Sequence, residues 1–228
     1  MPFESFPDRV RQDIPLAPYT WLQLGGPAKY FVEPSDGEQL TAFIRYAHEK
    51  SIPARVLGGG SNLLIRDKGF DGLVLHLSAP GFNRISVSGN TVTCGGGVKL
   101  SHLITTCVGH GLGGLEHLVG IPGTVGGALR SNSSTDEGDI GSKLTQATLI
   151  NRKGEIQALA GAEANFSHRK STGLLVWRTT FSPHTSSISV LPIPQSAKMA
   201  ARCRLSAHPT KRSEEHTSEL QSHSDLVC

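Results

Sequence analysis

Apolar residues recur at helical spacing in two segments of the chain, 40–48 and 100–108. This spacing places them on one face of a helix in each segment. A turn at 35–37 precedes the first segment, and glycines between 109 and 114 end the second. The two faces consist of Leu40, Phe43, Ile44 and Ala47, and of Leu100, Leu103, Ile104, Cys107 and Val108.

Short apolar runs bounded by turn residues predict the strands. Two of these runs, with the helix at 40–48, indicate a small βαβ-like unit that ends near residue 78. The later runs form two probable hairpin pairs, the first joined by Gly89 and Asn90, which tolerate a positive φ. The predicted strands cover 54–57, 73–77, 84–88, 91–94, 146–151, 155–159 and 174–181.

The pattern changes after residue 181 to a mixture of Ser, Pro and His without a sustained period. Residues 212–223 (RSEEHTSELQSH) resemble the conceptual translation of a sequencing-library adapter. We therefore expect 182–228 to be a frameshifted and adapter-derived tail. The alternative is a genuine disordered tail of the same polar composition.

Composition and charge narrow the classes of function. The 26 glycines and only 6% aromatic residues favour a loop-rich α/β or α+β protein. A net charge of +3 provides no strong field for nucleic acid or an anionic membrane. The chain shows neither a signal peptide nor an apolar run of about 20 residues, so we expect a cytoplasmic protein.

Metal ligation is not expected from the sequence. The four cysteines lack CxxC spacing, and the histidines lack patterns such as HExxH. Cys94 and Cys107 are interpreted as small buried thiols. The acidic residues Asp136, Glu137 and Asp139 are interpreted as a solvated loop.

A glycine triplet followed by Ser and Asn comes directly after the predicted strand at 54–57. Without Cβ atoms, such a loop can turn backbone N–H groups onto a phosphate and let a ligand approach closely. The run lacks the third glycine of GxGxxG and the Lys-Ser/Thr of a P-loop. The alternative is a tight structural turn. The candidate binding residues are Gly58, Gly59, Gly60, Ser61 and Asn62.

A second loop of small residues covers 120–127. Pro122 and Gly123 predict a turn, and Thr124 would cap a short helix whose N-terminal amides would face an anion. Two such loops that converge in space indicate a ligand with two phosphates. The alternative is a packing turn where a helix closely approaches a sheet. The candidates here are Gly120, Ile121, Pro122, Gly123, Thr124, Gly126 and Gly127.

Three motifs occur in the order and at spacings similar to those of the UDP-N-acetylenolpyruvoylglucosamine reductase family. They are TWLQLGGPA at 20–28, LGGGSNLL at 57–64 and GLEHLVGIPGTVGGALRSN at 114–132, and the resemblance extends over about residues 16–181. It implies an α+β FAD-binding domain of the p-cresol methylhydroxylase type, with both glycine loops on the FAD pyrophosphate. The expected subdomains are 1–79 and 80–181, without the family's C-terminal substrate-binding domain.

The resemblance also implies a reaction. In that family NADPH reduces FAD, and the flavin passes hydride to UDP-N-acetylglucosamine enolpyruvate in peptidoglycan synthesis. The segment 166–171 is similar to the family's Tyr-Arg-x-Ser motif, with His168 in place of the tyrosine. Arg169 is then the catalytic candidate, because a guanidinium can stabilise enolate charge. From the residues alone, an Arg in such a basic cluster is more often a solvated surface charge.

Two of the family's motifs are missing from this chain. The acid serine in an Ala-Gly-Ser-x-Phe-Lys-Asn-Pro context does not occur, nor does the glutamate motif that assists it. Since general acid catalysis contributes about 10²- to 10⁴-fold, we expect poor turnover. The alternatives are a non-catalytic flavin-binding fragment and another FAD oxidoreductase of the same fold. We expect a monomer with a UDP-sugar as its partner.

Overall fold

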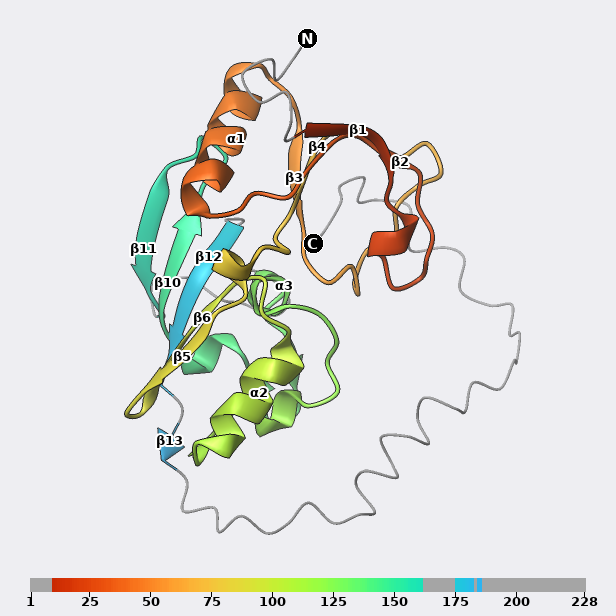
Figure 1. Cartoon of the computed structure of the whole chain (residues 1–228). Helices are drawn as coiled ribbons and strands as arrows, with labels where there is room; N and C mark the ends of the chain where they lie inside the picture. Colours follow the sequence, from red (N-terminus) through yellow and green to blue (C-terminus); the bar gives the residue numbers. More distant parts are fainter. Residues whose placement is uncertain (1–9, 162–174, 183, 186–228) are drawn as a thin grey trace, which may run out of the picture.

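Two β-sheets organise the chain in its computed structural model, which describes residues 10–161, 175–182 and 184–185 (Figure 1). The first sheet has the order β1-β2-β4-β3, in which β2 and β3 run parallel to β4 and β1 is antiparallel to β2. Its strands are β1 (Val10–Pro15), β2 (Pro27–Val32), β3 (Ala54–Leu57) and β4 (Phe70–His76). The parallel pairs confirm the βαβ-like unit.

Helix α1 (Gly37–Glu49) connects β2 to β3 and covers the first sheet. Its N-cap is Asp36, whose carboxylate accepts a hydrogen bond from the Gln39 amide at 2.9 Å. The predicted apolar face is buried, which confirms the helix over 40–48. This packing explains why the amphipathic segment is helical in the fold.

The second sheet is antiparallel throughout, with the order β11-β10-β12-β6-β5. Both predicted hairpins are present as β5–β6 and β10–β11, with β12 inserted between β10 and β6. The strands are β5 (Ile85–Ser88), β6 (Thr91–Gly95), β10 (Leu144–Ile150), β11 (Ile156–Ala160) and β12 (Leu175–Phe181). The strand predicted at 174–181 therefore belongs to the centre of a sheet.

Helices α2 (Leu100–Gly109) and α3 (Val125–Arg130) pack on the second sheet, as their shared apolar core shows. Short strands and 3₁₀ turns complete the fold. They are β7 (Leu112–Gly113), β8 (Ser134–Thr135), β9 (Gly138–Asp139), β13 (His184–Thr185), and the turns at Ala17–Tyr19, Pro80–Phe82, Glu116–Leu118 and Gly141–Lys143. Strand β13 pairs with β7.

The second sheet has one apolar core, and the residues of the first sheet contribute to two. Ile150 of β10 is buried in the cluster formed by α1 and the first sheet, although its strand belongs to the second. The thiols of Cys94 and Cys107 are buried in the core of the second sheet, as expected. Burial raises the pKa of Cys94 to about 12, with a smaller opposing effect of the Thr179 hydroxyl, and raises the pKa of Cys107 to about 11.

Glu33, which follows β2, connects the edge strand β1 to the end of β4. One carboxylate oxygen lies 2.7 Å from Nη2 of Arg11, and the other accepts from Ser78 at 2.7 Å and lies 3.0 Å from Nδ1 of His76. Partial burial alone would raise the pKa of Glu33, but the hydrogen bonds and the positive charge of Arg11 lower it overall.

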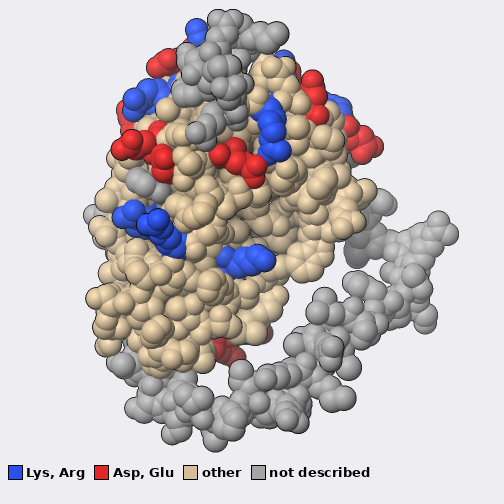
Figure 2. Space-filling view, in the orientation of Figure 1, with Lys and Arg blue, Asp and Glu red and all other residues tan. Residues whose placement is uncertain are grey.

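The distribution of charge gives no sign of a polyanion-binding surface on the face shown in Figure 2. Basic and acidic side chains mix over the upper half, and few charges lie over α2 below. Within the described part of the chain, no helix is long and apolar enough to cross a membrane. No cluster of three or more His, Cys, Asp or Glu side chains suited to a metal occurs among the same residues.

The buried centre of the first sheet allows a stability test. Leu73 of β4 is fully buried, whereas Leu22 is 58% exposed. We expect Leu73→Ala to lower the free energy of unfolding by about 2–5 kcal/mol, because it leaves a cavity in a packed core. The matched variant Leu22→Ala should stay within about 0.5 kcal/mol of the wild type. Urea denaturation measures both, and equal losses would contradict this core assignment.

Candidate functional site

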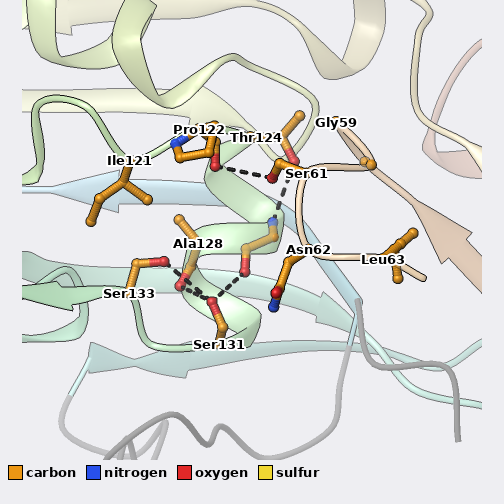
Figure 3. Close-up of a pocket in the computed structure, with 14 residues that line it drawn as sticks. Gly59, Ser61, Asn62, Leu63, Ile121, Pro122, Thr124, Ala128, Ser131 and Ser133 are labelled. Carbon is orange, nitrogen blue, oxygen red and sulfur yellow. Dashed lines mark hydrogen bonds between the residues drawn. The ribbon is translucent and has the colours of Figure 1, made fainter. Parts of the chain in front are cut away.

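The loop after β3 lines a cavity of about 230 Å³ between the two sheets' connecting segments (Figure 3). The loop lies at the carboxyl end of parallel strands, the edge where open sheets of this kind place ligands. The second glycine loop forms the facing side. The lining residues are Gly58, Gly59, Gly60, Ser61, Asn62, Leu63, Ile121, Pro122, Gly123, Thr124, Gly127, Ala128, Ser131 and Ser133.

The two loops touch, although about 60 residues separate them in the sequence. The Ser61 hydroxyl donates to the carbonyl oxygen of Pro122 at 3.1 Å. A Cβ atom on Gly58 would lie 2.6 Å from Oγ1 of Thr124, and one on Gly123 would lie 2.7 Å from Oγ of Ser61. A side chain at Gly58 or Gly123 would therefore displace the hydroxyl of Thr124 or Ser61 from its hydrogen bond, and Gly123 also has a φ of +116° that favours glycine. This arrangement confirms that the two predicted loops converge.

Gly60 fixes the first loop from the other side. Its φ is +63°, and a Cβ atom there would lie 2.0 Å from the carbonyl oxygen of Tyr19. Its own carbonyl accepts a hydrogen bond from the Trp21 amide at 3.0 Å. The segment TWLQLGG is thus packed against the glycine triplet, which gives the first family motif a structural role.

Both loops carry free hydrogen-bond donors of the cavity. The backbone N–H groups of residues 59–62, and those of Gly123 and Thr124, donate to no acceptor within the described part of the chain. None of the described residues that line the cavity is charged. An anion held here would therefore be bound by consecutive amide dipoles, which is the arrangement of an anion-binding nest.

The prediction that the N-terminal amides of the short helix α3 face an anion is wrong. The amide of Val125 donates to Val98, that of Gly126 to Gly96, and that of Gly127 to the Thr124 side chain. Thr124 is the N-cap, as predicted. The first-turn amides are all used inside the protein, because α3 packs so closely on 96–98 that a Cβ on Gly126 would lie 2.9 Å from the Gly96 carbonyl.

A Schellman motif ends α3 and brings two further serines to the cavity. The Asn132 amide donates to Leu129, and the Ser133 amide donates to Ala128 at 2.8 Å. Asn132 occupies the left-handed position with a φ of +43°, and its side-chain oxygen accepts from the Gly141 amide. Ser131 and Ser133 then point toward each other in Figure 3, with 3.2 Å between their hydroxyl oxygens.

The predicted site residues divide into three groups. Ten of the twelve candidate cofactor residues line the cavity, whereas Gly120 and Gly126 do not. Gly126 instead allows α3 to pack closely on 96–98, as in the alternative interpretation of this loop as a packing turn. Arg169 and His168 lie outside the described residues. Four lining residues were not among the candidates: Leu63, Ala128, Ser131 and Ser133. The pair Ser131-Asn132 was the available signal for the two serines. Asn favours the left-handed position that ends a helix, so the pair indicates a helix end next to Ser131 and Ser133.

A family model described as FAD binding domain matches residues 28–160 of the chain. The protein belongs to this FAD binding domain family. The match includes both glycine loops and most of both sheets. It confirms the predicted fold class, an α+β FAD-binding domain.

Several curated relatives are similar to the chain. UDP-N-acetylenolpyruvoylglucosamine reductase of Rhodopirellula baltica is 43% identical over 194 residues, which cover 82% of this chain and 64% of the relative. UDP-N-acetylenolpyruvoylglucosamine reductase 2 of Symbiobacterium thermophilum is 41% identical over 72% of this chain and 53% of its own. The resemblance to these reductases is therefore confirmed. The chain spans between half and two thirds of these relatives' length.

Solved structures agree with the family assignment. The UDP-N-acetylenolpyruvylglucosamine reductase of Thermus caldophilus has a TM-score of 0.68 and 29% identity, covering 88% of this chain and 71% of its own. Glucooligosaccharide oxidase of Acremonium strictum has a TM-score of 0.54 and 21% identity, covering 68% of this chain and 35% of its own. The likeness to the oxidase shows the fold alone, so the same FAD-binding architecture also occurs in an oxidase.

Two glycines with positive φ test the packing of the loop in the FAD binding domain. Both Gly60→Ala and Gly89→Ala place alanine in a left-handed conformation, which costs about 1–2 kcal/mol. Gly60→Ala should lower the free energy of unfolding by more, because its Cβ atom would also collide with the backbone of Tyr19. Nothing lies within 4 Å of a Cβ on Gly89. Urea denaturation of both variants measures the difference. Equal destabilisation would mean that the loop does not pack against Tyr19.

Proposed function

We propose that the cavity binds the diphosphate of FAD. The observation that carries the proposal is the contact between two glycine loops around a cavity. Four consecutive N–H groups of its wall have no acceptor among the residues that the structure describes. Backbone amides suit a diphosphate because they offer several donors without requiring a charged side chain. The ten predicted residues that line the cavity are the proposed contacts. Gly120 and Gly126 would act by shaping the loop.

The size of the cavity fits part of the cofactor. Pockets that enclose a drug-sized ligand are about 300–1,000 Å³, and this cavity is about 230 Å³. It therefore suits the diphosphate and the adjoining sugar hydroxyls, with the ring systems outside it. Leu64 follows the loop in the sequence, and the backbone amide of Trp21 bonds to Gly60 of the loop. Both have exposed side chains that are available to such rings.

The activity that we propose is that of the reductases the chain resembles. Bound FAD supplies hydride-transfer chemistry, with NADPH as the reductant and the enolpyruvyl UDP-sugar as substrate. Arg169 would stabilise the negative charge that develops on the substrate's enolpyruvyl carboxylate. We further propose that residues 1–79 and 80–181 act as two FAD-binding subdomains, and that the protein is a cytoplasmic monomer in peptidoglycan synthesis.

Binding of FAD tests the first part of the proposal. At a hundredfold excess over Kd, FAD should add about 2.7 kcal/mol of stability. This corresponds to a rise in Tm of about 5–10 °C, measured by the circular dichroism of apo-protein with and without FAD. Folded protein whose Tm is unchanged by FAD would refute the site.

A negative charge added to the loop localises the diphosphate. Ser61→Asp should weaken FAD binding at least about tenfold, because a carboxylate beside the unpaired amides repels the phosphates. Ser61→Asn has a similar size without the charge and serves as the control. Isothermal titration at two salt concentrations measures both variants, and the difference should shrink as salt screens the repulsion. Equal affinities for the two variants would place the diphosphate elsewhere.

The assignment of the reaction has its own test. We expect NADPH consumption that depends on UDP-N-acetylglucosamine enolpyruvate to be at least about 100-fold slower than in a reductase that carries the acid serine and glutamate motifs. The product can be measured by mass spectrometry. A rate equal to that of such a reductase would show that another group in this chain supplies the proton.

A further inference from the structure

Two serine side chains in the cavity are not explained by the glycine loops. Ser131 and Ser133 line it next to α3, and both are half-buried. In Figure 3 they lie at the lower side of the cavity, whereas the contact between Ser61 and Pro122 lies at the upper side. Their backbone is fixed by the Schellman motif at Asn132. They are therefore a rigid part of the wall.

Counting protons shows what this wall offers to a ligand. A hydroxyl has one proton and two lone pairs. Ser131 uses its proton on the carbonyl oxygen of Gly127 at 3.1 Å, shared with that of Ala128 at 3.4 Å. Either hydroxyl can donate in the 3.2 Å contact between them, and with the Ser131 proton on these carbonyls the donor is Ser133. In this arrangement the single proton of Ser133 is used, so Ser133 presents lone pairs to a ligand.

The cavity thus has a donor side and an acceptor side. The amides of 59–62 donate, which suits phosphate oxygens. A phosphate oxygen next to Ser133 would face lone pairs, whereas a sugar hydroxyl could donate to them. We propose that Ser133 accepts a hydrogen bond from a hydroxyl group of the cofactor's ribityl or ribose unit, with Ser131 orienting Ser133. The proposal rests on the proposed FAD site and orients the dinucleotide within it.

Removal of the acceptor tests the proposal. Isothermal titration of apo-protein with FAD should show a Kd about 3- to 10-fold higher for Ser133→Ala than for the wild type, the size expected for one lost hydrogen bond. Ser101→Ala makes the same change on the exposed side of α2, away from the cavity, and should leave the Kd unchanged. A wild-type Kd for Ser133→Ala would overturn the proposal.

Ser131→Ala separates the acceptor role from a merely structural one. Both variants lose the hydrogen bond between the two hydroxyls, but only Ser133→Ala removes the lone pairs that face the ligand. We expect Ser131→Ala to raise the Kd less than twofold, although it also loses its bond to α3. If Ser131→Ala weakens FAD binding as much as Ser133→Ala, or more, the role is structural and the proposal fails.

Two fragments of the cofactor identify the donating hydroxyl. ADP carries the ribose and the diphosphate, and FMN carries the ribityl chain, so each is titrated as a competitor of FAD. If Ser133→Ala weakens the binding of ADP alone, the donating hydroxyl is on the ribose, and if it weakens the binding of FMN alone, the hydroxyl is on the ribityl chain. Equal losses of affinity for ADP and FMN would contradict a single defined contact. Wild-type protein that binds no FAD would instead refute the proposed function, and the inference with it.

Discussion

The close approach of two glycine loops is the constraint on which the site depends. Residues 58–60 and 122–124 meet so closely that a side chain at Gly58 or Gly123 would displace the hydroxyl of Thr124 or Ser61. The contact brings the carboxyl ends of the parallel strands against the segment before α3. Helix α3 itself packs on the antiparallel sheet. Without that contact, the cavity would have only one wall. The glycines therefore act first as spacers between two parts of the fold and only then as ligand contacts.

Hydrogen-bond accounting decides which amides of the two loops can bind an anion. The first-turn amides of α3 are satisfied by residues 96–98 and by Thr124, since buried amides need partners. The amides of 59–62, Gly123 and Thr124 are left without an acceptor in the described part of the chain. On the opposite side, the hydroxyls of Ser131 and Ser133 bond to α3 and to each other. In the proposed site, a neutral hydroxyl and an anion would therefore bind to different walls, without a charged side chain.

The elements that local patterns did not predict have physical reasons. Strand β1 is mostly exposed and polar, so it shows little apolar alternation, and it is held by pairing with β2 and by Glu33. Strand β2 begins at Pro27 directly after two glycines, and Gly-Gly-Pro predicts a turn rather than the start of a strand. The Schellman motif at Asn132 depends on where α3 ends, and a helix of six residues has too little periodicity to define that end.

The amino-acid sequence by itself determined both main helices, the two hairpins, the cap at Thr124 and the family, because these depend on local periodicity, on turn residues and on motif order. It also provided ten of the residues that line the cavity. Only the tertiary structure decided that the two loops touch, that the α3 amides are already bonded and that two serines complete the wall. Those facts depend on hydrogen bonds between residues far apart in the chain, whose partners no local pattern specifies.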